Sequence, residues 1–219
     1  MRYPNAAKGI NKIWIAEILS IVAALLAIVM VFLVAANHID TTISGDEAVQ
    51  ALETAKIGGP VVGLGLGMML LVLVSYILNL IGIVNASKDD EGFKRALWAL
   101  LASIAFGVVA AILENSNARV ANWLEVPSTL FELVVMIYVL EGIGNLARNL
   151  VKNDIVDLGK QCRTWLMCAL ILAADAEIFV AIGTEGSVLN TTSGVAAALL
   201  QLVAYVAYLR VLNRARQMQ

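Results

Sequence analysis

The stretch IWIAEILSIVAALLAIVMVFLVAA, residues 13–36, is apolar except for Glu17 and Ser20. A helix that crosses the roughly 30 Å hydrocarbon core of a bilayer needs about 20 such residues. The stretch lacks the polar–apolar alternation of a half-buried strand. It is also too long for the apolar region of a signal peptide, and no small-residue cleavage site follows it. Residues 13–36 are therefore predicted to form a transmembrane helix.

Similar apolar blocks recur along the rest of the chain, at about 61–85, 96–113, 128–147, 164–183 and 194–212. The sequence of 219 residues is 60% hydrophobic and 15% charged, whereas a soluble domain is about 45–50% apolar and about 25% charged. Six spans use up the length, so no soluble domain of ordinary size fits beside them. We predict an all-α membrane protein with six transmembrane helices in a single domain, residues 1–219.

The distribution of basic residues predicts the orientation of the spans. Of the fifteen Lys and Arg residues, the loops after the first, third and fifth spans contain two, Lys56 and Arg119. The other thirteen lie before the first span, in the loops after the second and fourth spans, and at the C-terminal end from Arg210 onwards. Cytoplasmic segments carry an excess of Lys and Arg. This pattern predicts a cell-membrane protein with both termini in the cytoplasm.

The six spans pair into three similar helical hairpins, at about 13–85, 96–147 and 164–212. Each second span of a pair ends in a related string that starts at Tyr76, Tyr138 or Tyr205. Each first span starts with Gly followed by Trp, namely Gly9/Trp14, Gly92/Trp98 and Gly159/Trp165. The strings are typical of an internal repeat. The alternative is that Trp and Tyr recur because they favour the membrane interface.

Polar side chains follow one face of each second span. Residues three, four and seven apart share a helix face, which groups Tyr138, Glu141, Asn145 and Arg148. The corresponding residues are Tyr76 with Asn79 and Tyr205 with Tyr208. If these stripes converge, they form a polar pathway for a solute or ion. The alternatives are interhelical hydrogen bonds of about 0.6 kcal/mol each and, for Glu141, an ion pair with Arg148.

Four other acids fall within the predicted spans. Glu17 and Glu132 lie near span ends, where we expect interfacial positions. Asp175 and Glu177 are two residues apart, so on a helix they point to nearly opposite sides and do not form a paired-carboxylate site. Either can bind a cation or proton on the outer side of the pathway. Alternatively, both lie in the outer headgroup region.

Two features surround the start of the second span. Gly59, Gly63 and Gly67 form a small-residue ladder that allows another helix to approach closely, within the subunit or between subunits. A capping box at Ser44–Glu47 predicts an amphipathic helix at about 46–57 in the longest outer loop. This helix is either a lid over a binding site or a connector.

Known catalytic and cofactor motifs are absent from the sequence. We find no HExxH zinc motif, Walker A motif or nucleophile elbow, and no cluster of His and Cys. Basic residues lie at helix ends rather than in a nucleic-acid-binding patch. We therefore expect no catalytic residue, metal or cofactor, and no activity as an enzyme or in nucleic-acid binding.

These features favour a small transporter or channel for a small solute or cation within the lipid bilayer, as a homo-oligomer or as part of a larger membrane complex. The alternative is a non-catalytic subunit of a larger membrane complex, either a substrate-binding component or an assembly partner. In length and span number the chain is similar to the substrate-binding subunits of vitamin transporters. Ala23-x-x-x-Ala27 is similar to their small-residue docking motif.

Overall fold

A computed structural model describes residues 3–36, 58–113, 118–181 and 188–218, and all of their regular structure is helical. Within the helices, the side chains of residues 35, 58, 118–119, 121–122, 125, 175–181 and 188–198 lie outside the description. The helices are α1 (Pro4–Ala36), α3 (Gly58–Ala86), α4 (Glu91–Leu113), α5 (Ala118–Asn149), α6 (Asn153–Ala181) and α7 (Val188–Ala215). The all-α fold is thereby confirmed. The helix predicted at 46–57 lies outside the described residues.

Length and composition support a multi-pass membrane protein. Among the described residues, four helical segments are long and apolar enough to cross a membrane, namely Pro4–Val34, Gly59–Ala86, Glu91–Leu113 and Val126–Asn149. They match the first four predicted spans. The fifth and sixth spans fall on α6 and α7, where many side chains are undescribed, so their membrane crossing stays a prediction.

Several helices extend beyond the predicted spans. α1 begins at Pro4, before the span predicted from residue 13, and α6 begins at Asn153, before the span predicted from residue 164. Hydropathy marks only the part of a helix that suits hydrocarbon, while backbone hydrogen bonding continues the helix into polar sequence. α5 likewise runs through Pro127, just before its predicted span.

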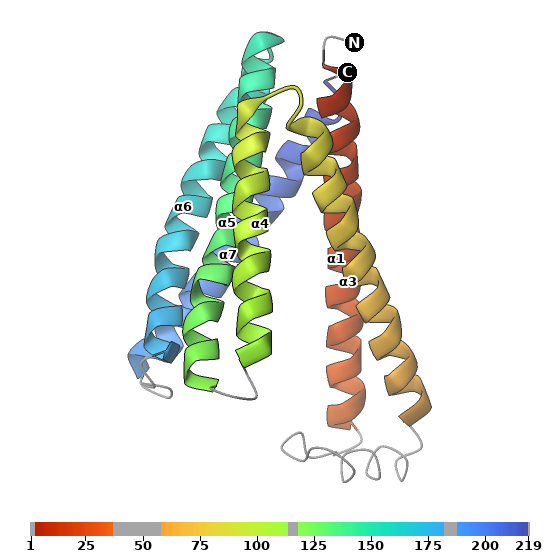
Figure 1. Cartoon of the computed structure of the whole chain (residues 1–219), viewed down its shortest axis with the longest axis vertical. Coiled ribbons are helices and arrows are strands. Elements are labelled where there is room, and N and C mark those ends of the chain that lie inside the picture. Colours follow the sequence, from red (N-terminus) through yellow and green to blue (C-terminus); the bar gives the residue numbers. More distant parts are fainter. Residues whose placement is uncertain (1–2, 37–57, 114–117, 182–187, 219) are drawn as a thin grey trace. The chain divides into compact units, whose positions relative to one another are not determined.

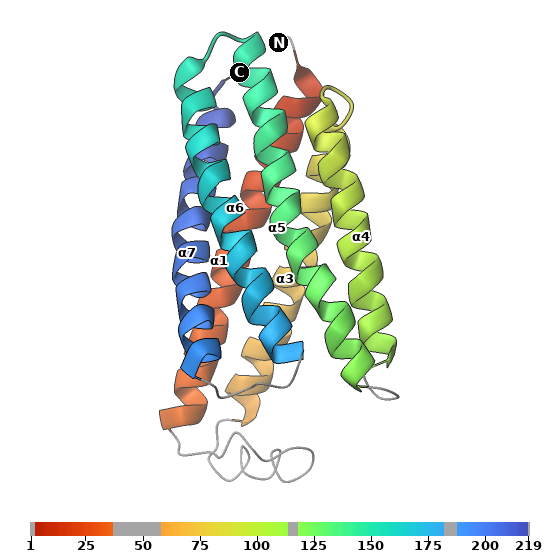
Figure 2. The ribbon, with the colours of Figure 1, turned by 90° about the vertical axis from the view of Figure 1, so that its left-hand side faces the viewer.

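The chain packs as two compact units. The first consists of Met1–Trp14 and Leu80–Gln219, and the second of Ile15–Asn79. In the first unit, α4 packs against α5, α5 against α6, and α6 against α7 (Figures 1 and 2). The hairpins predicted at 96–147 and 164–212 are therefore packed helix pairs. Because α5 also packs against α6, packing is not confined to the predicted pairs.

The hydrophobic core of the first unit contains residues from both of its sequence segments. Its largest fully buried side chains include Tyr208, Phe93, Ile13, Ile83, Ile143, Leu166 and Leu212. Tyr3 and Met218, from the two ends of the chain, also pack against this core. Both chain ends, the turn between α3 and α4, and the turn between α5 and α6 lie at the same end of the unit (Figure 1).

Asp89, in the turn between α3 and α4, caps the N-terminus of α1. Asp89 Oδ2 accepts a hydrogen bond from the backbone N–H of Ala6 at 2.7 Å, and its Oδ1 accepts one from Asn5 Nδ2 at 3.0 Å. The N–H groups of the first helical turn have no partner within the helix, and a carboxylate also complements the positive end of the helix dipole. Asp89 thus caps α1, from a position more than eighty residues further along the chain.

Glycine pairs set the closest helix crossings. A Cβ atom built on Gly9 would overlap the backbone of Gly82, and one on Gly92 would lie 2.5 Å from the backbone nitrogen of Gly142. A Cβ on Gly159, the corresponding residue of the third hairpin, would meet no described atom within 4 Å. The close crossing is therefore shared by two hairpins, and the threefold repeat stays a prediction.

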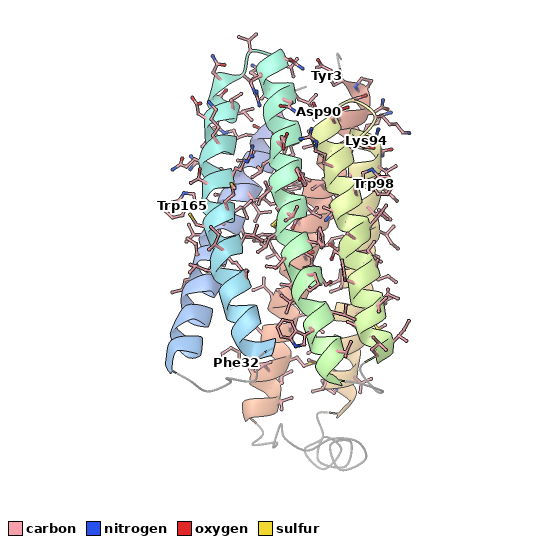
Figure 3. The ribbon with its side chains drawn as sticks, turned by 60° about the vertical axis from the view of Figure 1, so that its left-hand side comes forward. Tyr3, Phe32, Asp90, Lys94, Trp98 and Trp165 are labelled. Carbon is pink, nitrogen blue, oxygen red and sulfur yellow. The ribbon has the colours of Figure 1, made fainter. Side chains whose placement is uncertain are left out.

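The three repeated tryptophans occupy two kinds of surroundings. Trp98 and Trp165 are exposed and point away from the neighbouring helices (Figure 3). Such positions suit tryptophans that anchor helices at a membrane interface. Trp14 is instead covered by the Arg216 guanidinium, whose carbon lies 3.7 Å from the ring centroid. This cation–π contact joins α1 to the end of α7.

Candidate functional site

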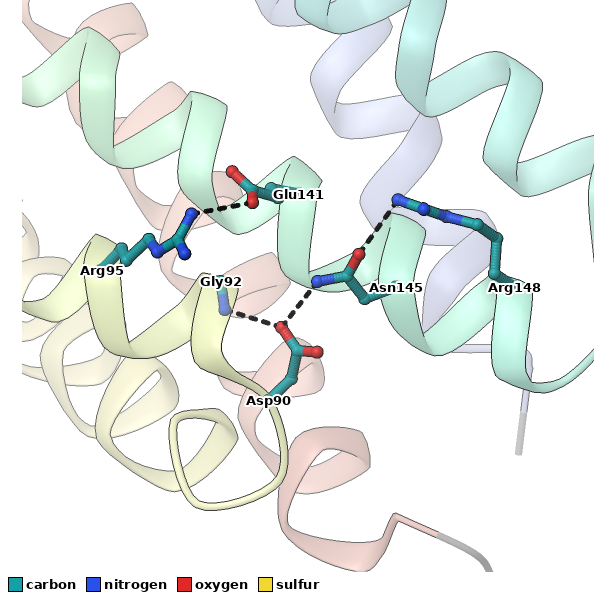
Figure 4. A network of polar contacts seen from close by, with 6 residues as sticks. All are labelled: Asp90, Gly92, Arg95, Glu141, Asn145 and Arg148. Atoms are coloured by element: carbon teal, nitrogen blue, oxygen red, sulfur yellow. Dashed lines mark hydrogen bonds and ion pairs between the residues drawn. The ribbon is translucent and has the colours of Figure 1, made fainter.

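An ion pair connects α4 to α5 within segments that are apolar enough to span a membrane. Arg95 Nη1 lies 3.2 Å from Glu141 Oε1 (Figure 4). The Arg95 side chain is 56% exposed and the Glu141 side chain 23% exposed. The charge of Glu141 is therefore neutralised across the helix pair and remains partly accessible.

A second set of polar contacts begins one helical turn further along α5. Asn145 Nδ2 donates a hydrogen bond to Asp90 Oδ1 at 3.3 Å. The same oxygen accepts a hydrogen bond from the backbone N–H of Gly92 at 2.7 Å, so Asp90 also caps α4. Arg148 donates to Asn145 Oδ1 at 3.0 Å and to the carbonyl of Gly144 at 3.3 Å. We call Asp90, Arg95, Glu141, Asn145 and Arg148 the α4/α5 network (Figure 4).

The α4/α5 network differs in one respect from the sequence-based expectation. Glu141, Asn145 and Arg148 follow one face of α5, but the structure pairs Glu141 with Arg95 rather than with Arg148. Arg148 is turned towards Asn145 and Gly144, while Arg95 lies opposite Glu141 on α4. Sequence reasoning used Arg95 only for topology and did not consider Asp90. Their roles depend on the register of two helices, which spacing within one helix does not define.

The other predicted pathway residues lie in different surroundings. In the first unit, Tyr138 and Tyr205 are half-buried against the core, and Tyr208 is fully buried within it. Tyr76 and Asn79 belong to the second unit, where Tyr76 is exposed and Asn79 half-buried. The structure therefore groups Glu141 with Asn145 and places the tyrosines of the first unit around its core. Convergence of all three stripes stays a prediction.

Asp175 and Glu177 lie on α6, but their side chains fall outside the description. Gly59, Gly63 and Gly67 lie on α3, where a Cβ atom on each would meet no described atom within 4 Å. The glycine ladder therefore packs against no described segment of this chain. Its role between subunits stays a prediction.

A second polar cluster lies in the second unit, between α1 and α3. Ser75 Oγ donates to the carbonyl of Ala16 at 2.8 Å, and the Ser20 and Ser75 hydroxyl oxygens are 2.7 Å apart. Glu17 is only 8% exposed, and its expected position near the membrane interface stays a prediction. Asn79 Oδ1 is enclosed and accepts no hydrogen bond from any residue that the structure describes. The burial of Glu17 was not predicted, because distance from a span end says nothing about packing against other helices.

Within the described part of the chain, no group of three or more His, Cys, Asp or Glu residues is placed to hold a metal ion. The α4/α5 network contains two acids and two arginines, so its formal charges cancel.

Comparison with known proteins supplies no relative whose site can be transferred to this chain. The chain matches no protein-family model, no curated protein and no solved structure.

Proposed function

We propose that this chain carries a small solute or cation across the cell membrane, with the α4/α5 network at the cytoplasmic mouth of the pathway. The supporting observation is the Arg95–Glu141 pair, a partly exposed ion pair within two apolar helices. A solvent-exposed pair contributes only about 0–1 kcal/mol, whereas breaking a buried pair costs about 3–5 kcal/mol. A charged solute can therefore displace either partner at small cost.

The proposed pathway continues from the network along the polar residues of the second spans. Tyr138, Tyr205 and Tyr208 would line it in the first unit. Asp175 or Glu177 would supply the outer charge. The cytoplasmic assignment of the mouth rests on the excess of Lys and Arg in the terminal segments and in the turns at this end.

Neutralising Glu141 tests the proposal. In liposomes that contain the purified protein, we expect Glu141→Gln to reduce flux at least tenfold, because the solute loses its charged exchange partner. The probes are radioactive rubidium and sodium, with liposome swelling in glycerol for a neutral solute. The variant should keep its elution volume and helical circular dichroism, since Gln retains the shape of Glu.

Glu91→Gln is the matched control, because Glu91 is an exposed acid in the first turn of α4. It should retain wild-type flux. A Glu141→Gln variant that transports at the wild-type rate would contradict the assignment. So would a wild-type protein that moves none of the three probes.

The glycine ladder of α3 favours a second candidate function, that of a subunit in a larger membrane assembly. Small residues in a lipid-exposed ladder allow another helix to pack closely, and no described part of this chain fills that role. Native mass spectrometry after extraction in mild detergent should then show a partner or a second copy. Gly63→Leu should dissociate it, while Val61→Leu, on the opposite side of α3, should not. A monomeric wild-type protein would exclude this candidate.

A further inference from the structure

One face of α4 is exposed over almost the whole length of the helix. On the opposite face, Ala96, Ser103 and Ala110 are buried, and Ser103 bonds to Ser128 of α5. The exposed face is made of residues three or four apart, which share one side of a helix. These residues, which we call the outer stripe of α4, are Lys94, Trp98, Leu101, Ala105, Val108 and Ile112.

The outer stripe passes from charged to aromatic to aliphatic side chains. Lys94 lies near the turn between α3 and α4, and Trp98, which is 67% exposed, follows one helical turn later on the same outer side (Figure 3). Every later residue of the stripe is apolar, and Ile112 is 70% exposed. Tryptophan favours the headgroup level of a membrane, and a nearby lysine extends its ammonium group among the headgroups. The stripe therefore follows the polarity of a phospholipid from its headgroup to its acyl chains.

The described residues leave the charge of Lys94 without a partner. Lys94 forms no ion pair or hydrogen bond with any residue in the described part of the chain. Arg95, the next residue, is paired with Glu141. Exposed basic side chains at the membrane surface attract anionic lipids. Lys94 is therefore the charge on this face that favours an anionic over a zwitterionic lipid.

The apolar part of the stripe is long enough for an acyl chain in one leaflet. Half of the hydrocarbon core is about 15 Å thick, and a helix covers that distance in about ten residues. Trp98 and Val108 are separated by this length of α4, which lies within a segment apolar enough to span a membrane. Headgroup and acyl chain can therefore contact the same stripe at the same time.

We propose that the outer stripe of α4 binds one anionic phospholipid, with the phosphate at Lys94 and an acyl chain along Trp98 to Val108. The exposed Trp165 of α6 provides an internal comparison. It has Gln161 in place of a lysine one turn earlier, and the exposed Lys160 nearby is paired with Asp157 at 3.4 Å. The inference goes beyond the proposed transport function, because lipid binding is measured without flux.

Native mass spectrometry tests the proposal on the purified full-length chain in detergent, titrated with phosphatidylglycerol or phosphatidylcholine. We expect the first phosphatidylglycerol to bind about fivefold more tightly than phosphatidylcholine, and Lys94→Gln to remove this preference, since one basic residue contributes about that much at a membrane surface. Lys94→Arg keeps the charge and should keep the preference. Trp98→Ala should weaken both lipids, because it removes an apolar contact that does not depend on headgroup charge.

Lys160→Gln is the matched control, because it changes the net charge by the same amount and should leave the preference intact. Equal affinity of the wild type for the two lipids overturns the proposal, as does an unchanged preference in Lys94→Gln. Equal losses in Lys94→Gln and Lys160→Gln would show an effect of net charge alone and would also overturn it. Soluble glycerol phosphate should not displace the lipid; if it does, the chain binds phosphate rather than a phospholipid.

Discussion

Gly92→Ala should destabilise the first unit by about 3 kcal/mol, at the upper end of the usual cost of overpacking. A Cβ atom at this position would lie 2.5 Å from the backbone nitrogen and 2.7 Å from the Cα atom of Gly142. A flexible side chain could rotate away from such a contact, but backbone atoms cannot move without separating α4 from α5. Reversible unfolding in mixed detergent micelles measures the loss.

Gly144→Ala is the control for this prediction. Gly144 is buried within α5, yet a Cβ atom there would meet no described atom within 4 Å. Alanine is favoured over glycine inside a helix by up to about 1 kcal/mol, so this variant should be as stable as the wild type or slightly more stable. If both variants unfold at the same denaturant concentration, the result contradicts the close approach of α4 and α5 at Gly92 and Gly142.

Asp89→Ala should destabilise the protein by about 1–2 kcal/mol, the usual cost of losing a helix N-cap. The substitution leaves the N–H of Ala6 and the amide of Asn5 without their acceptor, and it removes a negative charge from the positive end of α1. Amide hydrogen exchange should become faster in the first turn of α1 rather than in α4. Thermal unfolding in detergent gives the overall loss.

Asp157→Ala provides the comparison for Asp89→Ala. Asp157 forms an exposed pair with Lys160 at 3.4 Å within α6, which contributes at most a few tenths of a kcal/mol. Its removal should leave both exchange and unfolding nearly unchanged. Equal effects of the two substitutions would mean that Asp89 acts only as a surface charge.

Much of the fold could be predicted from the sequence, because membrane insertion leaves a strong pattern. A long apolar block such as residues 13–36 has few alternatives to a spanning helix, and the structure places helices at all six predicted blocks. Helix ends were less predictable. Pro4 and Asn153 begin helices well before the apolar residues start, since caps and packing define those ends.

The candidate sites were only partly predictable. The spacing of residues along α5 correctly predicted that Asn145 and Arg148 share one face of the helix. This prediction needs only the geometry of a single helix. The partner of Glu141 depends on how α4 is aligned with α5, and nothing within either helix specifies that register. The burial of Glu17 likewise results from tertiary packing, which hydropathy does not report.

The cation–π contact between Trp14 and Arg216 has a consequence for biosynthesis. The ribosome makes roughly 200 residues between these two positions, and at about 5–20 residues per second this takes roughly 10–40 s. During that interval α1 has been inserted, but its contact with α7 cannot yet form. A nascent chain that stops before Arg216 therefore leaves the Trp14 ring without its cationic cover.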